Sequence, residues 1–126
     1  MLKTISRAQL GIAGATVVAV AVGGYAHGAS AVILPQRVTV AASEYKFALN
    51  KRTVKKGGKV IFTISNKGTE VHDFKVVGKT PKSRFITGGQ KTTLTLTFLK
   101  AGRYQYVCTI GEHAIKGMQG TLIVVK

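Results

Sequence analysis

Two stretches of this chain alternate strictly between apolar and polar side chains, which restricts the folds that it can adopt. Val60, Phe62 and Ile64 alternate with other residues in one stretch, and leucines alternate with threonines over 93–98. Because successive side chains of a strand point to opposite faces, each stretch predicts a β-strand with one buried face. Shorter runs of the same kind, separated by turn residues, fill the chain after Arg37. The pattern predicts an all-β, two-sheet Greek-key β-sandwich of antiparallel strands. The expected strands are 37–42, 44–49, 53–55, 60–65, 71–77, 93–98, 103–108 and 121–125.

The beginning of the chain has a different pattern. Lys3 and Arg7 precede a long uncharged, largely apolar stretch, and the triplet 29–31 consists of small residues. This order predicts that residues 1–31 form a secretory signal peptide. The stretch is also long enough for the roughly 20 residues of a membrane-spanning helix, so a retained N-terminal anchor helix stays open. Both alternatives predict export, to the periplasm or to the outer face of the cytoplasmic membrane.

The length of 126 residues allows one ordinary domain after this leader, which we expect at 37–126. A second catalytic domain does not fit. We therefore expect a monomer with one working domain, associated with a membrane only if residues 1–31 are retained.

The charge of the chain is strongly positive. Nineteen Lys and Arg residues face only four acidic ones, which gives a formal net charge of +15. Such a field attracts anionic partners, and we expect acidic redox proteins among them. Nucleic acid is not expected as a partner, because no RNA-binding aromatic signature or zinc-knuckle spacing accompanies the basic residues. The four acidic residues are Glu44, Glu70, Asp73 and Glu112.

Four residues of the expected domain combine into a pattern of metal ligands. Cys108 is the only cysteine, His113 follows it by five residues, and Met118 follows by five more. His72 is the one remaining histidine after the leader, whose His27 we leave out. Two imidazoles, a thiolate and a weak axial thioether are the donors of electron-transfer copper sites. Zinc, the main competitor, rarely uses methionine.

Each of these residues also has an ordinary explanation. Cys108 could be a buried inert thiol, His113 a surface histidine, Met118 a core residue, and His72 a hydrogen-bonded strand residue. The joint occurrence favours the metal site, because these are the only Cys, His and non-initiator Met residues after the leader.

The expected domain resembles the cupredoxin family of blue copper proteins, which includes plastocyanin and azurin. The resemblance is carried mainly by the segment 104–120, and more weakly by 44–47, 56–60 and 72–74. It implies one copper ion that cycles between Cu(II) and Cu(I). By similarity, the equatorial ligands would be His72, Cys108 and His113, with Met118 as the axial ligand and an edge of the His113 ring at the surface.

The resemblance also implies a function without substrate turnover, namely the transfer of single electrons between donor and acceptor proteins. An apolar patch at Ile110, Gly111, Ala114, Ile115 and Gly117 would be the docking surface. Two alternatives remain open: a copper-binding or copper-delivery protein in the export compartment, and an accessory cupredoxin subunit of a larger oxidoreductase. No carboxylate pair, nucleophile–base pair or open metal position predicts an enzyme. At the position of Asp73 many relatives have Asn, and its side chain is expected to link the two segments that carry the ligands.

Overall fold

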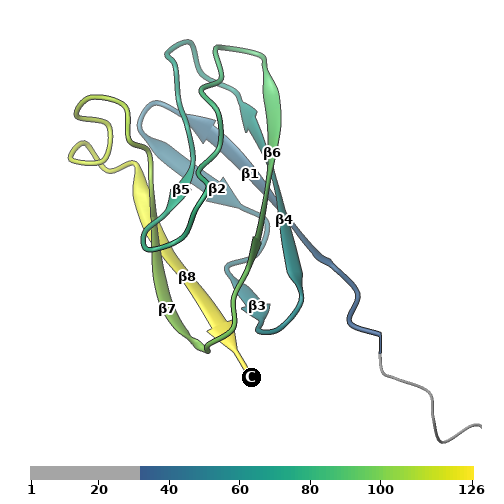
Figure 1. The fold of residues 1–126 in the computed structure, drawn as a ribbon. Coiled ribbons are helices and arrows are strands. Elements are labelled where there is room, and N and C mark those ends of the chain that lie inside the picture. The colour runs from purple at the N-terminus through teal and green to yellow at the C-terminus, as the bar shows by residue number, and fades with distance from the viewer. Residues whose placement is uncertain (1–31) are drawn as a thin grey trace, which may run out of the picture. The chain divides into compact units, whose positions relative to one another are not determined.

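The computed structural model describes residues 32–126, which form eight strands in the compact unit Ile33–Lys126 (Figure 1). The predicted signal peptide or anchor helix at 1–31 lies outside the described residues. No helix within 32–126 is long and apolar enough to cross a membrane. The strands are β1 (Gln36–Ser43), β2 (Lys46–Leu49), β3 (Thr53–Lys55), β4 (Lys59–Asn66), β5 (Lys75–Val76), β6 (Lys91–Thr97), β7 (Gly102–Val107) and β8 (Gln119–Val125).

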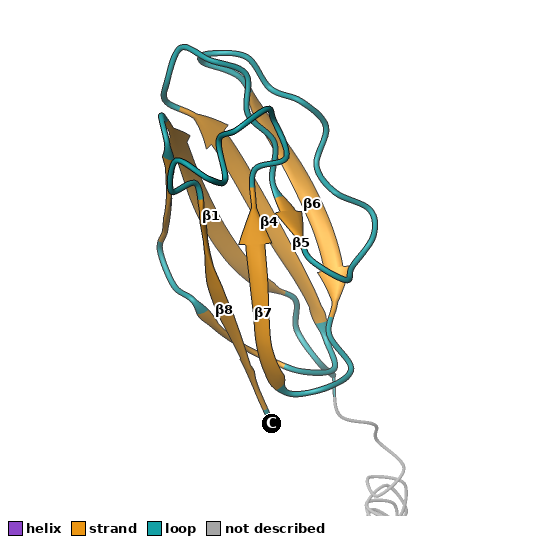
Figure 2. Cartoon of the chain, turned by 90° about the vertical axis from the view of Figure 1, so that its left-hand side faces the viewer, coloured by secondary structure: helices purple, strands orange, loops and turns teal. Residues whose placement is uncertain are grey.

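The strands form two sheets that face each other (Figure 2). One sheet has the order β2-β1-β4-β6 and the other the order β3-β8-β7-β5. The two-sheet, all-β architecture confirms the prediction. The expectation that all strands pair antiparallel was wrong, because β1 pairs parallel with β4 and β3 parallel with β8. In both pairs the partners are distant in sequence, and alternation within one strand does not reveal the direction of a distant partner.

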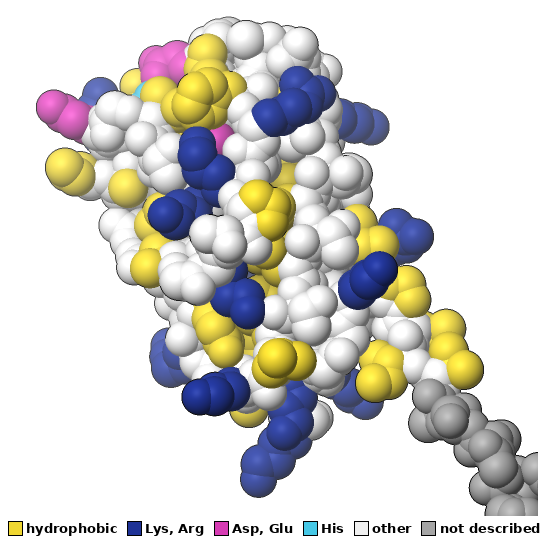
Figure 3. Space-filling model, viewed as in Figure 1, with side chains coloured by type: hydrophobic (Ala, Val, Ile, Leu, Met, Phe, Trp, Pro, Cys, Tyr) yellow, Lys and Arg dark blue, Asp and Glu magenta, His cyan; other side chains and the backbone are white. Residues whose placement is uncertain are grey.

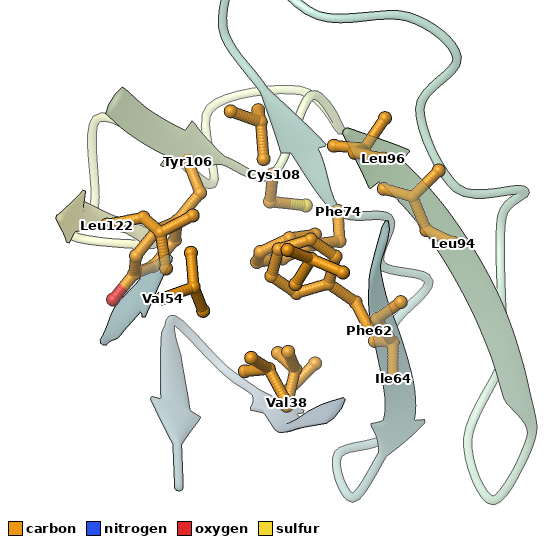
Figure 4. Packing of buried hydrophobic residues seen from close by; sticks show 14 of the residues in the cluster. Val38, Val54, Phe62, Ile64, Phe74, Leu94, Leu96, Tyr106, Cys108 and Leu122 are labelled. Atoms are coloured by element: carbon orange, nitrogen blue, oxygen red, sulfur yellow. The ribbon is translucent and has the colours of Figure 1, made fainter. Parts of the chain in front are cut away.

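The predicted alternation produces the core between the sheets. In β4 the side chains of Val60, Phe62 and Ile64 are fully buried, and their neighbours in the strand are half-buried. Phe74 lies among aromatic rings, with ring centroids 5.2 Å from Phe62 and 5.4 Å from Tyr106. Figure 4 shows Phe74 at the centre of the packed cluster, with Tyr106 to one side. Cys108 belongs to the same cluster. The core therefore extends up to the predicted metal ligands.

The predicted strand 71–77 is mostly irregular, and only Lys75–Val76 forms β5. His72 makes an isolated bridge with Ile86, in which each backbone N–H donates to the other residue's carbonyl at 2.9–3.0 Å. The Phe74 N–H donates instead to the Ser83 hydroxyl at 2.8 Å. The segment before β5 is thus held by the long loop that follows β5. A local sequence pattern does not reveal such contacts, so the segment was predicted as a regular strand.

Candidate metal centre

The predicted ligands meet at one end of the sandwich, where the loop between β7 and β8 lies near the segment before β5 (Figure 1). One nitrogen of His72, the sulfur of Cys108 and one nitrogen of His113 all lie within 4.8 Å of one another. The Cys108 Sγ is 3.9 Å from His72 Nδ1 and 3.6 Å from His113 Nδ1. All three side chains are buried. Two imidazole nitrogens thus lie close to one thiol among buried side chains.

Met118 is also fully buried and is fixed next to the other candidates by its backbone. Its carbonyl accepts a hydrogen bond from the Cys108 N–H at 3.1 Å, and its N–H donates to the His113 carbonyl at 3.0 Å. The structure thereby brings the backbones of all three candidates of this loop together. Axial ligation by the Met118 thioether stays a prediction.

The ligand loop between Cys108 and Met118 is a series of tight turns. The His113 N–H donates to the Ile110 carbonyl at 2.9 Å, and the Gly117 N–H donates to the Ala114 carbonyl at 3.0 Å. Gly117 has a φ of 117°, a conformation that side-chain-bearing residues rarely adopt. The turns fold the two five-residue spacings back toward Cys108, which explains why this spacing suits one compact site.

The segment that carries His72 is fixed by Asn66 at the end of β4. The Asn66 side chain is buried, and its amide nitrogen donates to the carbonyls of Glu70 and Ile86 at 2.7 and 2.9 Å. Its amide oxygen accepts from the Gly68 N–H at 2.8 Å. Asn66 therefore helps to position His72, because it binds Glu70 in the segment before His72 and Ile86, which forms the isolated bridge with His72.

Asp73 links the two ligand segments, as the resemblance implies for this position. Its fully buried carboxylate accepts from the Thr109 N–H at 2.7 Å and from the Thr109 hydroxyl at 2.5 Å. Lys82 forms an ion pair with the same carboxylate at 2.5 Å. Burial raises the pKa of Asp73, but the hydrogen bonds from Lys82 and Thr109 outweigh it, so the pKa lies below its usual value. The ionised carboxylate therefore ties the neighbour of His72 to the neighbour of Cys108.

Both imidazoles have a carboxylate at the nitrogen that faces away from Cys108. His72 Nε2 lies 3.1 Å from Glu44 Oε1, and His113 Nε2 lies 2.9 Å from Glu70 Oε1. The tyrosine hydroxyl of Tyr45 donates to the other oxygen of Glu70 at 2.9 Å, and its ring packs edge-on against the His113 ring. The His113 side chain is 10% exposed, so most of the ring is covered.

These two carboxylates were missed by the sequence reasoning. Glu44 stands 28 positions before His72, and Glu70 stands 43 before His113, so no local spacing connects them. A signal was nevertheless present, because a chain with 19 basic residues keeps only four acidic ones. Glu44, Glu70 and Asp73 all contact the candidate ligands or their immediate neighbours.

The pocket suits a soft, positively charged ion. Burial raises the pKa of the Cys108 thiol above its usual value, so the metal-free thiol holds its proton at neutral pH. A metal that binds the thiolate releases this proton, which couples binding to pH. Two imidazole nitrogens and a thiolate are donors that copper accepts, and the buried methionine beside them is atypical of zinc sites. The described residues therefore fit copper.

Comparison with known proteins supports this assignment. Residues 14–124 match the cupredoxin-like domain family. No curated protein matches the chain by sequence. Among solved structures, auracyanin B is 18% identical with a TM-score of 0.66, and the match covers 78% of this chain and 94% of that chain. Rusticyanin from Thiobacillus ferrooxidans, described as a copper protein, is 25% identical with a TM-score of 0.61, covering 71% and 77%.

The same fold also occurs within a larger enzyme. A copper-containing nitrite reductase from Thermus scotoductus is 21% identical with a TM-score of 0.61, and the match covers 73% of this chain but 28% of that chain. The family match spans well over half of the chain, and His72, Cys108 and His113 have the arrangement of a type 1 copper site. The chain belongs to the cupredoxin-like domain family and has copper as its cofactor.

Proposed function

We propose that this chain is an exported one-electron carrier whose single copper ion is held by His72, Cys108, His113 and Met118. The observation that carries the proposal is the cluster of two imidazole nitrogens and one thiol sulfur within 4.8 Å, all buried. Bound there, copper would supply a one-electron couple between Cu(II) and Cu(I). The protein contributes a site whose ligands are already in place.

Fixed ligands favour fast electron transfer because little has to move when the charge of the metal changes. Asn66 and the Ile86 bridge hold the backbone of the His72 segment, and Asp73 ties this segment to Thr109. Each ligand-bearing backbone is therefore anchored by hydrogen bonds that do not involve the metal. Copper sites of this donor set suit both oxidation states, because thiolate and thioether favour Cu(I) and imidazole accepts both.

The loop around His113 offers a surface for redox partners. Ile115 is 83% exposed, so an apolar side chain projects from the ligand loop into solvent. Lys116 lies over the ring of Tyr45, which in turn contacts His113. We propose that donor and acceptor proteins dock here, and that the many basic residues elsewhere steer acidic partners toward the chain.

Electron self-exchange tests this proposal without a known partner. Full-length chain loaded with copper should take up one electron from ascorbate and return it to ferricyanide, with one electron per copper. In a mixture of Cu(I) and Cu(II) protein, NMR line broadening reports exchange between two copies through their docking surfaces. Ile115→Asp should slow exchange while the thiolate-to-copper absorption band stays.

Leu99→Asp is the matched control, because Leu99 is 73% exposed but lies before β7, at the strand end opposite Cys108. An equal effect of both variants would contradict docking at the ligand loop. Copper that cannot be cycled between its oxidation states in the intact site would contradict the carrier function.

The similarity to nitrite reductase supports a second candidate, an accessory electron-transfer subunit of a larger oxidoreductase. In that protein the matched part is 28% of a longer chain. Isolation of the natively expressed chain in a stable complex that holds a second redox centre would favour this candidate over the free carrier.

A further inference from the structure

The acidic residues of this chain are concentrated at the end of the sandwich that carries the candidate copper ligands. The acidic side chains visible in Figure 3 lie at the end that carries the loop between β7 and β8, whereas Lys and Arg are spread over the whole visible face, that end included. Three of the chain's four acidic residues contact the candidate ligands or their immediate neighbours, and the fourth, Glu112, is adjacent to His113 in sequence. In a chain with 19 basic residues, three of the few carboxylates therefore lie next to the candidate ligands, and two of them, Glu44 and Glu70, contact the imidazoles directly.

The carboxylate of Glu44 is held by backbone hydrogen bonds in addition to its contact with His72. One oxygen of its carboxylate accepts hydrogen bonds from the N–H groups of Thr69 and Glu70, at 2.9 and 2.7 Å. A Cβ atom at Gly68 would overlap this carboxylate, so the glycine makes room for it. The contact with His72 Nε2 at 3.1 Å therefore comes from a carboxylate that two backbone N–H groups already hold in place.

Glu70 is held at the other imidazole by different contacts. Its Oε1 lies 2.9 Å from His113 Nε2, and its Oε2 accepts the hydroxyl proton of Tyr45 at 2.9 Å. The Tyr45 ring packs edge-on on His113 with a centroid distance of 5.0 Å. Glu70 is 45% exposed, so the pair lies at the boundary between the buried site and solvent. The two pairs place one carboxylate behind each imidazole.

The contacts determine which ring nitrogen carries the proton. The Glu44 carboxylate already accepts from two backbone N–H groups and the Glu70 carboxylate from the Tyr45 hydroxyl, so each acts as an acceptor and Nε2 of the ring that it contacts is the donor. In a neutral imidazole the other nitrogen, Nδ1, then has a free lone pair. In both His72 and His113 it is Nδ1 that faces Cys108 Sγ. The carboxylates thus select the tautomer that can bind a metal.

We propose that Glu44 and Glu70 are positioning residues that fix the tautomer and orientation of His72 and His113, and that their charges favour Cu(II) over Cu(I). The proposal rests on the proposed copper site and adds to it. A ligand histidine whose other nitrogen donates to a carboxylate becomes a stronger donor, and loss of such a partner typically costs about 10- to 100-fold in metal affinity. Negative charge near the metal stabilises the higher oxidation state and lowers the reduction potential.

Two kinds of substitution separate positioning from charge. Glu44→Ala and Glu70→Ala remove the acceptor, whereas Glu44→Gln and Glu70→Gln remove the charge but keep an oxygen that can accept. Glu112→Gln is the matched control, since it removes a charge beside His113 from an exposed residue whose carboxylate makes no hydrogen bond or ion pair within 32–126. All five variants are made in the full chain.

The first measurement uses the metal-free protein and does not depend on copper. Nitrogen-15 NMR of the imidazoles should show Nε2–H for both histidines in the parent chain and in the Gln variants. The affected ring should become a mixture of tautomers in each Ala variant. If Glu44→Ala does not fold, Glu44→Gln and Glu70→Ala carry the test, and backbone NMR dispersion identifies that case.

The second measurement uses the copper-loaded chain. Competition with a chelator should show Cu(II) affinity about 10- to 100-fold lower in the folded Ala variants and nearly unchanged in Glu112→Gln. The Gln variants should have a higher reduction potential, by about 59 mV for each tenfold loss of Cu(II) affinity that Cu(I) does not share. Parent-like tautomers, affinity and potential in the Glu44 and Glu70 variants would overturn the proposal. A parent chain without a Cys108-dependent copper band would refute the copper site instead, while the tautomer measurement still tests positioning.

Discussion

Replacing Asp73 should destabilise the metal-free protein, because its carboxylate is a buried link between two ligand segments. Asp73→Ala removes two hydrogen bonds from Thr109, and hydrogen bonds to a charged group contribute about 1.5–3 kcal/mol each. The ion pair with Lys82 adds only about 0–1 kcal/mol, because Lys82 is 37% exposed and can be rehydrated. The substitution also relieves the cost of burying a charge, which offsets part of the loss. The expected net loss is about 3 kcal/mol.

Asp73→Asn provides the comparison, because its amide oxygen can still accept from the Thr109 N–H. The expected loss is about 1 kcal/mol, mainly from the Lys82 contact and the weaker acceptor. Urea unfolding of the metal-free full-length chain, followed by circular dichroism, measures both values. If the two variants lose the same unfolding free energy within about 0.5 kcal/mol, or if Asp73→Ala loses less than about 1 kcal/mol, the hydrogen bonds to Thr109 do not stabilise the link between the two segments.

Substitutions of one core residue, Phe74, and of two residues at the site, Met118 and Glu44, have further expected effects. Phe74→Ala should lower the free energy of unfolding by about 3–5 kcal/mol, because a fully buried ring leaves a cavity, and a loss under about 1.5 kcal/mol in urea unfolding would contradict this. Met118→Leu should lower the free energy of unfolding of the metal-free chain by less than about 1.5 kcal/mol. The same substitution should raise the reduction potential, because Cu(II) loses a fourth donor that Cu(I) needs less. An unchanged potential by voltammetry would exclude axial ligation by Met118. The pKa of Glu44 is lowered from 4.5 to about 2, so its contribution to stability is present above about pH 4.5 and is lost as the pH falls toward 2. In Glu44→Gln the unfolding midpoint of the metal-free chain should therefore fall less steeply with pH between 4.5 and 2, and equal slopes would show that the carboxylate is not perturbed.

The parts of the fold that depend on local patterns could be predicted from the sequence. The alternation of Val60, Phe62 and Ile64 correctly indicated a strand with one buried face, because burial on a sheet has a period of two. The parallel pairing of β1 with β4 could not be predicted in this way, since it depends on how the chain returns after two intervening strands. The predicted strand at 71–77 failed for a similar reason, because the partners of His72 and Phe74 lie in the following loop.

The candidate site was predictable where its residues are rare and close in sequence. Cys108, His113 and Met118 are spaced regularly in one loop, and the structure holds their backbones together. The carboxylates next to the imidazoles were not predicted. Glu44, for example, lies 28 positions before His72 in the sequence, and the two side chains meet only in the folded chain. Such partners depend on tertiary structure rather than on spacing.

A Cu(II) titration of the full-length chain, followed by visible absorption and electron paramagnetic resonance, tests the copper site most directly, with Cys108→Ser in parallel. We expect one copper per chain, an intense thiolate-to-copper absorption band and a narrow copper hyperfine splitting, with both spectral features absent in the variant. A colourless or ordinary tetragonal copper complex in the parent chain, or the same spectrum in Cys108→Ser, would contradict a type 1 copper site.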